Sequence, residues 1–149
     1  MGKKSYSNPR PYILRGQIPE FTETQILDIE PARTGWAWRI RSFYVAGQMN
    51  DQNDDVYAKL STRPTGTANW NWNDSREVAW ASTAMESTTS AFAPWSLVDP
   101  QLIVSELHIT GNTKGLAGSV FNYFVELERV AVNDDMTVLG LIRERVQNE

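Results

Sequence analysis

The alternation of apolar and polar residues over residues 120–132 constrains the fold of this chain more than any other feature. Side chains in a strand point to its two faces in turn, so this run places Phe121, Tyr123 and Val125 together on one face. The turn residues NDD and a second run of strand length at 136–146 follow. Two such runs joined by a short turn predict a β-hairpin, although the letters LIRERV in the second run would also tolerate a helix.

Similar runs of strand length recur along the rest of the chain, separated by turn residues. A stretch rich in small and hydroxyl residues at 83–100 is predicted to be a long loop, as are 47–55 and 61–75. About eight strands with long loops and no clear helix predict an all-β protein, an antiparallel β-sandwich that is jelly-roll-like. The other predicted strands are 11–18, 21–30, 36–47, 56–62, 76–82 and 101–110.

Three tryptophans and the single histidine lie inside these predicted strands. Trp36, Trp38 and Trp80 stand in apolar runs and are expected in the core. His108 alternates with the apolar residues of ELHIT, so its side chain is expected on the opposite, solvent-facing side of that strand.

Composition indicates one folded domain of 149 residues, since 41% of them are hydrophobic and 21% are charged. A single β-sandwich is expected at 13–149, preceded by an extended arm at 1–12 in which prolines exclude a helix. No apolar run approaches the roughly 20 residues that cross a bilayer. The N-terminus shows neither a secretory signal nor a myristoylation motif, so no membrane partner is expected.

The net charge of −4 conceals a basic segment attached to an acidic body. Residues 1–16 contain four bases and no acid, whereas the remainder contains 10 bases and 18 acids, a net charge of −8. A basic arm of this kind predicts contact with nucleic acid or with a neighbouring molecule, and the simpler interpretation is a solubilising tail. The four bases are Lys3, Lys4, Arg10 and Arg15.

The residue types of common catalytic and metal sites are scarce. With one histidine and no cysteine, the chain is expected to be neither an enzyme nor the holder of a cofactor or a His/Cys metal site. Asp51, Asn53 and Asp55 alternate as at the start of a calcium loop, but the glycine and glutamate of an EF-hand do not follow. A looser calcium site on this loop stays open beside the interpretation as a solvated turn.

Two tryptophans stand apart from the apolar runs. Trp70 and Trp72 alternate with asparagines in NWNWND, and an extended segment would project both rings on one side. Trp95 is a third candidate, on another predicted loop. Paired aromatic faces beside amides are typical of carbohydrate-binding surfaces and also of protein–protein interfaces.

Together these features resemble the single jelly-roll structural proteins of small viruses. The resemblance rests on the arm GKKSYSNPRP, the strand count, the Ser/Thr/Asn/Pro-rich loops and stretches such as LVDPQLIVSELHI and NYFVELERVAVNDDMTVLGLIRERVQ. It implies a capsid or coat subunit that self-assembles with its own copies, meets other virion proteins, and resides in the virion after assembly in the host cytoplasm. Trp70, Trp72 and Trp95 would then lie between copies, and the arm would contact a neighbour or nucleic acid. The rival hypothesis is a carbohydrate-binding β-sandwich module with Trp70 and Trp72 as its stacking platform.

Overall fold

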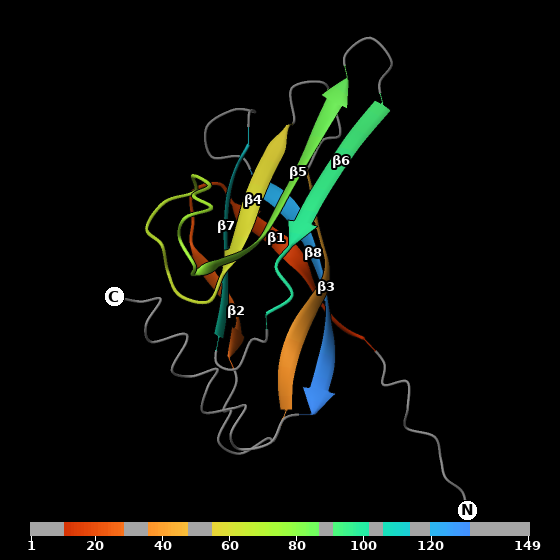
Figure 1. Ribbon diagram of the computed structural model, residues 1–149. Helices are drawn as coiled ribbons and strands as arrows, with labels where there is room; N and C mark the ends of the chain where they lie inside the picture. Colours follow the sequence, from red (N-terminus) through yellow and green to blue (C-terminus); the bar gives the residue numbers. More distant parts are fainter. Residues whose placement is uncertain are drawn as a thin grey trace, which may run out of the picture.

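The computed structural model describes residues 11–28, 36–47, 55–86, 91–101, 106–113 and 120–131, which form eight strands (Figure 1). None of these residues forms a helix of the length and apolarity that a bilayer crossing requires. The strands are β1 (Tyr12–Pro19), β2 (Thr24–Asp28), β3 (Trp36–Gly47), β4 (Val56–Ser61), β5 (Glu77–Glu86), β6 (Ala91–Val98), β7 (Glu106–Thr113) and β8 (Val120–Ala131).

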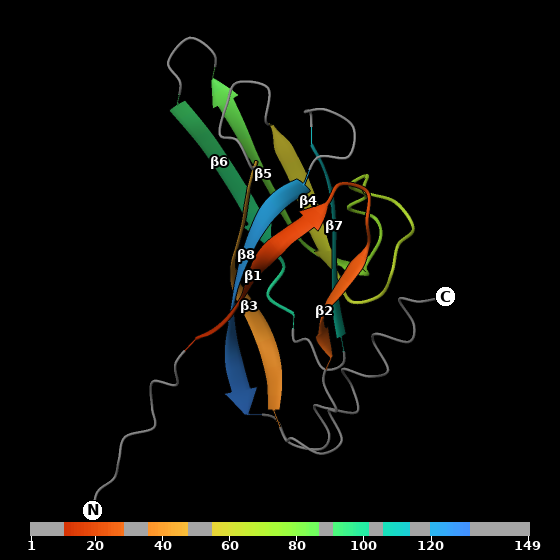
Figure 2. The same cartoon turned by 180° about the vertical axis from the view of Figure 1, so that it is seen from behind.

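The strands form two antiparallel sheets that pack face to face as a sandwich. One sheet has the order β1-β8-β3 and the other β2-β7-β4-β5-β6. Figure 1 looks onto the five-stranded sheet, and Figure 2 shows β1 and β8 of the three-stranded sheet from behind. The predicted all-β antiparallel sandwich of about eight strands is therefore confirmed.

The strand pairing is nested in the manner of a jelly roll. The first strand pairs with the last, the second with the seventh and the fourth with the fifth, as in a long hairpin rolled into a sandwich. A complete nesting would also pair the third strand with the sixth. Instead, β6 forms its ladder with β5 and packs against β3. The three-stranded sheet therefore lacks a fourth strand among the described residues, and β6 extends the other sheet.

The core lies between the inner faces of the two sheets. Phe121, Val125 and Leu127 of β8 are fully buried there, which confirms the face predicted from the alternation of that run. They meet Leu107 and Ile109 of β7, which are also fully buried. Each such side chain contributes on the order of 1.5–3 kcal/mol by leaving water.

The loop predicted at 83–100 is wrong. The segment 83–100 is not a long loop, because β5 continues to Glu86 and most of the remainder forms β6. Pro94 lies inside β6 and is tolerated because, among the described strands, β6 pairs only with β5 and forms the edge of its sheet. The strand predicted at 136–146 lies outside the described residues.

Strand β7 contains Gly111, a residue at which the sequence predicts the strand to end. The predicted end at Gly111 is wrong, since β7 continues to Thr113. A Cβ at Gly111 would lie 2.7 Å from Cζ of Phe121 and 2.7 Å from the carbonyl oxygen of Tyr57. Glycine is therefore required here by close packing inside a strand.

Candidate interaction surface

The loop at 62–76, between β4 and β5, covers part of the outer face of the five-stranded sheet (Figure 1). Polar side chains that alternate away from the core lie beneath it. Lys59 and Thr110 are buried, and so is His108. The prediction that His108 is a surface residue is wrong, although its side chain does point away from the core as expected.

A buried carboxylate, Glu77 at the start of β5, fastens this loop to the sheet. It accepts hydrogen bonds from Nζ of Lys59 at 2.8 Å, the backbone N–H of Asn71 at 2.9 Å and Nε1 of Trp80 at 2.8 Å. Lys59 also donates to the carbonyl oxygen of Asn69 at 2.7 Å. The side chains of Lys59 and Glu77 are at most 1% exposed, so each charge depends on the other for compensation.

Trp80 belongs to this outer layer and not to the core. It is the cross-strand partner of Lys59, whose side chain points away from the core, and paired residues share a face. Trp80 is buried, as predicted, although its ring lies in this outer layer and outside the central core cluster. Trp38 is partly buried against the core and its ring lies 5.1 Å from that of Tyr12, whereas the side chain of Trp36 lies outside the described part.

Two further carboxylates hold the loop in shape. Glu23 accepts the backbone N–H groups of Thr65 at 2.6 Å and Gly66 at 3.1 Å. Asp74 forms an ion pair with Arg76, 2.6 Å from its Nη2. The hydrogen bond from the Arg76 side chain lowers the pKa of Asp74 below its ordinary value. The loop is thus fixed at both ends and in the middle by charged hydrogen bonds.

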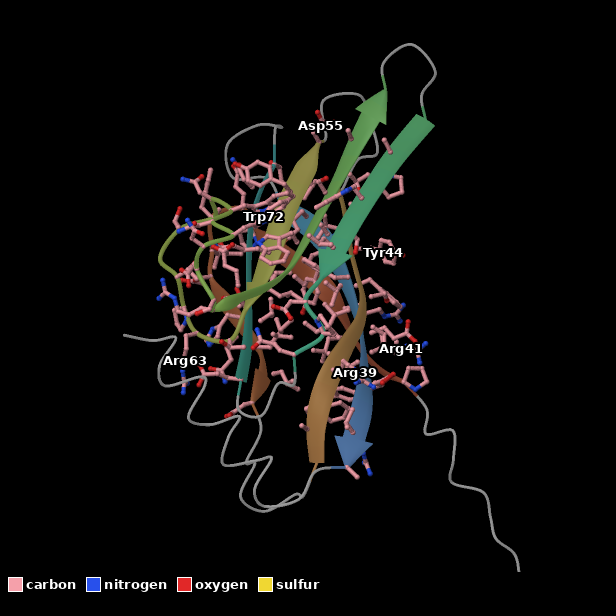
Figure 3. The ribbon with its side chains drawn as sticks, in the orientation of Figure 1. Arg39, Arg41, Tyr44, Asp55, Arg63 and Trp72 are labelled. Atoms are coloured by element: carbon pink, nitrogen blue, oxygen red, sulfur yellow. The ribbon has the colours of Figure 1, made fainter. Side chains whose placement is uncertain are left out.

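Aromatic side chains of the loop and of β6 meet on this face. The indole of Trp70 stacks on that of Trp95, with ring centroids 5.6 Å apart and an interplanar angle of 24°. Trp72 packs on Trp80 at 5.7 Å. Much of this surface stays open to solvent, because Trp72 is 62% exposed while Trp95 and Leu97 are each 43% exposed. We call Trp70, Trp72, Trp80, Trp95 and Leu97 the aromatic patch; Figure 3 shows Trp72 in front of β4 and β5.

The structure brings together the three tryptophans predicted as interface residues, but in a different way from that expected. The segment around Trp70 and Trp72 is not extended, because the N–H of Asp74 bonds back to the carbonyl oxygen of Asn71 in a turn. Trp70 is consequently half-buried against Trp95, and Trp72 carries most of the exposed ring surface. The sequence analysis missed Leu97, although its spacing of two from Trp95 would place both on one face of a strand.

Most of the predicted basic arm lies outside the described residues, namely Lys3, Lys4 and Arg10. Arg15 is described, and it is an exposed residue of β1. Its cross-strand neighbour is Phe124 of β8. Arg15 therefore belongs to the three-stranded sheet, on the other side of the sandwich from the five-stranded sheet that carries the aromatic patch.

The candidate calcium ligands lie mostly outside the described residues. Asp51 and Asn53 lie outside the described residues, and Asp55 directly precedes β4. Among the residues that are described, no cluster of three or more acidic or histidine side chains could hold a metal ion.

No family model, curated protein or solved structure matches this chain.

Proposed function

We propose that this protein is a structural subunit that self-assembles into a multi-copy particle, as the coat subunit of a virus does. The observation that carries the proposal is the aromatic patch, where Trp72, Trp95 and Leu97 are left exposed together on a sandwich of jelly-roll pairing. Exposed apolar clusters on folded proteins mark interaction sites, and tryptophan is enriched among the residues that dominate binding energy.

The patch is held ready for contact before any partner arrives. Trp70 and Trp72 sit on a loop that Glu77, Glu23 and Asp74 fasten through charged hydrogen bonds. A surface that is already ordered loses little conformational entropy on association, so more of the burial energy appears as affinity. This rigidity supports a role in repeated contacts between identical copies.

The viral character of the particle rests on the fold and on the sequence resemblance. Jelly-roll sandwiches form the coats of many viruses, and they also serve lectins and cupins. In the proposed particle the subunit contacts its own copies and other virion proteins, and it resides in the virion after assembly in the host cytoplasm. Identical interfaces repeated over a closed shell allow each contact to be modest.

The second candidate is a carbohydrate-binding module, which the large exposed face of Trp72 favours. The two-ring platform expected for such a module is not present in the described loop. Trp70 stacks on Trp95 and meets Tyr57 edge-on at 6.0 Å, whereas Trp72 packs on Trp80. A sugar would therefore find one open ring in place of a Trp70–Trp72 pair.

Light scattering coupled to size exclusion, with negative-stain microscopy of any large species, tests the assembly proposal. We expect uniform multi-copy particles from the unaltered chain and monomers from the Trp72→Ala/Trp95→Ala variant. Phe21→Ala is the matched control, since it removes a ring that is 65% exposed outside the patch. A clean monomer from the unaltered chain would refute assembly, and a glycan-dependent change in tryptophan fluorescence would then support the module. Particles that persist in the double variant would show that the patch is not the interface.

A further inference from the structure

A shallow groove crosses the outer face of the three-stranded sheet. This sheet forms the side of the sandwich that faces the viewer in Figure 2, away from the five-stranded sheet. The centre of the groove is a row of three cross-strand neighbours, Arg15 of β1, Phe124 of β8 and Tyr44 of β3. All three are exposed, with Tyr44 at 50% and Phe124 at 38%. The next row begins with the amides of Gln17 and Asn122. A cation, two aromatic faces and two amides thus share one open surface.

Arg15 differs from the other arginines near it. Arg39 and Arg41 both pair with Glu128, at 3.0 Å from Nε of Arg39 and 3.3 Å from Nη1 of Arg41. Arg15 has no carboxylate partner among the residues that the structure describes. Its charge is therefore available to a ligand, directly beside the ring of Phe124.

The charges of the described residues divide between the two sides of the sandwich. The three-stranded sheet carries four arginines and two glutamates, a net charge of +2. The remaining described residues carry nine acids against three bases, a net charge of −6. In sequence, the three further bases of the arm lead directly into β1. Figure 3 shows Tyr44, Arg39 and Arg41 on a side of the molecule away from Trp72.

We propose that this groove binds single-stranded nucleic acid. Unpaired bases stack on Tyr44 and Phe124, and the phosphate that flanks the base on Phe124 meets Arg15, on the far side of Phe124 from Tyr44. The strand must be single because a duplex hides its base faces, whereas an open sheet with neighbouring aromatic side chains presents stacking platforms to splayed bases. The amide of Gln17 is placed to donate to a base edge or a sugar.

A polyanion suits this surface better than the acidic side of a second copy. Three carboxylates of that side are engaged within their own chain, Glu23 with backbone N–H groups, Glu77 with Lys59, and Glu106 with Arg63 at 2.6 Å. They are not free to compensate Arg15 of a neighbour. Phosphates of a nucleic acid carry no such internal partners, and they come with flat rings that fit Tyr44 and Phe124.

Fluorescence anisotropy with end-labelled oligonucleotides of about 12 nucleotides tests the proposal on the full chain, since single-strand sites typically span roughly 4–16 nucleotides. Oligo-dT and oligo-rU distinguish DNA from RNA, and a duplex of equal length serves as comparison. We expect salt-sensitive binding of single strands and weaker binding of the duplex. Tyr44→Ala and Phe124→Ala should each weaken binding on the order of tenfold. Arg15→Gln should reduce the slope of log K against log salt by about 0.7, the value for one phosphate of a single strand.

Phe21→Ala is the matched control, because it removes an exposed ring outside both the groove and the aromatic patch, and it should leave oligonucleotide affinity unchanged. Tyr44→Leu and Phe124→Leu keep apolar volume without a stacking face and replace the alanine variants if those unfold. Measurement in the Trp72→Ala/Trp95→Ala background separates the two proposals, since binding by a monomer does not depend on assembly.

Three results would overturn the proposal. The first is the lack of salt-sensitive binding by the unaltered chain. The second is affinity that survives Tyr44→Leu and Phe124→Leu but disappears when residues 2–10 are deleted, which would locate binding in the arm. The third is that the groove variants lose particles while the unaltered chain binds no oligonucleotide. This result would make the face a contact between copies.

Discussion

The indole rings of Trp70 and Trp95 stack at 5.6 Å although one belongs to a loop and the other to an edge strand. The contact joins the loop at 62–76 to β6, the edge strand that lies beside β5 in the five-stranded sheet. The exposed surface of the patch is consequently a property of two segments held together, and each tryptophan fixes the other.

A double-mutant cycle on Trp70→Ala and Trp95→Ala should detect this dependence. Aromatic pairs contribute about 0.5–1.5 kcal/mol beyond the area they bury. The loss of unfolding free energy in the double variant should therefore differ from the sum of the two single losses by that amount. Urea unfolding of the wild type, both single variants and the double variant provides the measurement. Strict additivity would mean that the stacking contributes nothing of its own.

The buried pair of Lys59 and Glu77 should be the most sensitive polar contact in the molecule. Glu77→Gln leaves an uncompensated ammonium in a site that is 0% exposed, and removal of one partner of such a pair costs about 3–5 kcal/mol. Adding Lys59→Met to that variant should restore part of the loss, because no buried charge then remains. Denaturant midpoints at neutral pH measure both effects.

Glu128→Gln is a suitable comparison for the buried pair. Glu128 meets Arg39 and Arg41, whose side chains are 43% and 57% exposed. Ion pairs open to solvent contribute little to folding, so this change should be much milder than Glu77→Gln. Equal losses would contradict the role assigned to burial.

Acid should weaken the loop through Asp74. The hydrogen bond from Arg76 places the pKa of this carboxyl below its ordinary value of 3.8. Because the folded-state pKa is the lower one, the stabilisation is present above pH 3.8 and is lost as the pH falls through the folded-state value. The stability difference between wild type and Asp74→Asn should therefore shrink on acidification below about pH 4.

Urea midpoints measured from neutral to acidic pH test this behaviour, with Asp28→Asn as an exposed control on β2. Glu128 should behave similarly, since the hydrogen bond from Arg39 lowers its pKa from 4.5. A difference between wild type and Asp74→Asn that stays constant down to the most acidic sample would contradict the prediction.

Gly111→Ala should destabilise the sandwich by about 1–3 kcal/mol, the usual range for overpacking. The new methyl group would lie 2.7 Å from the Tyr57 carbonyl oxygen and 2.8 Å from Cβ of Ala58, neither of which can turn aside. Gly16→Ala is the control, because its closest neighbours belong to the Tyr123 side chain at 3.3 Å and have room to shift. Thermal unfolding should rank Gly111→Ala well below Gly16→Ala in stability.

The alternation of side chains predicted the strands well because burial on one face repeats every second residue. It placed Phe121 and Val125 in the core correctly, and likewise Leu107. Alternation gives the face of a side chain but not what covers that face. Lys59 and His108 both point away from the core, yet both are buried.

Local composition misled the prediction where tertiary contacts decide the backbone. The residues of β6 include Pro94, which usually argues against a strand, and only the position at a sheet edge makes it acceptable. Gly111 looked like the end of a strand but is required by the ring of Phe121. The groove of Arg15, Tyr44 and Phe124 was missed because its three residues come from strands far apart in sequence.

The division of charge between the two sides of the sandwich gives the described part of the molecule an electric dipole across its thickness. In the field of a charged boundary, whether a polyanion, an ion-exchange bead or a layer of its own copies, the subunit will turn before it touches. Its net charge of −4 therefore does not determine which boundaries it approaches. The side presented first is selected by long-range torque, which screening confines to about 10 Å at moderate salt.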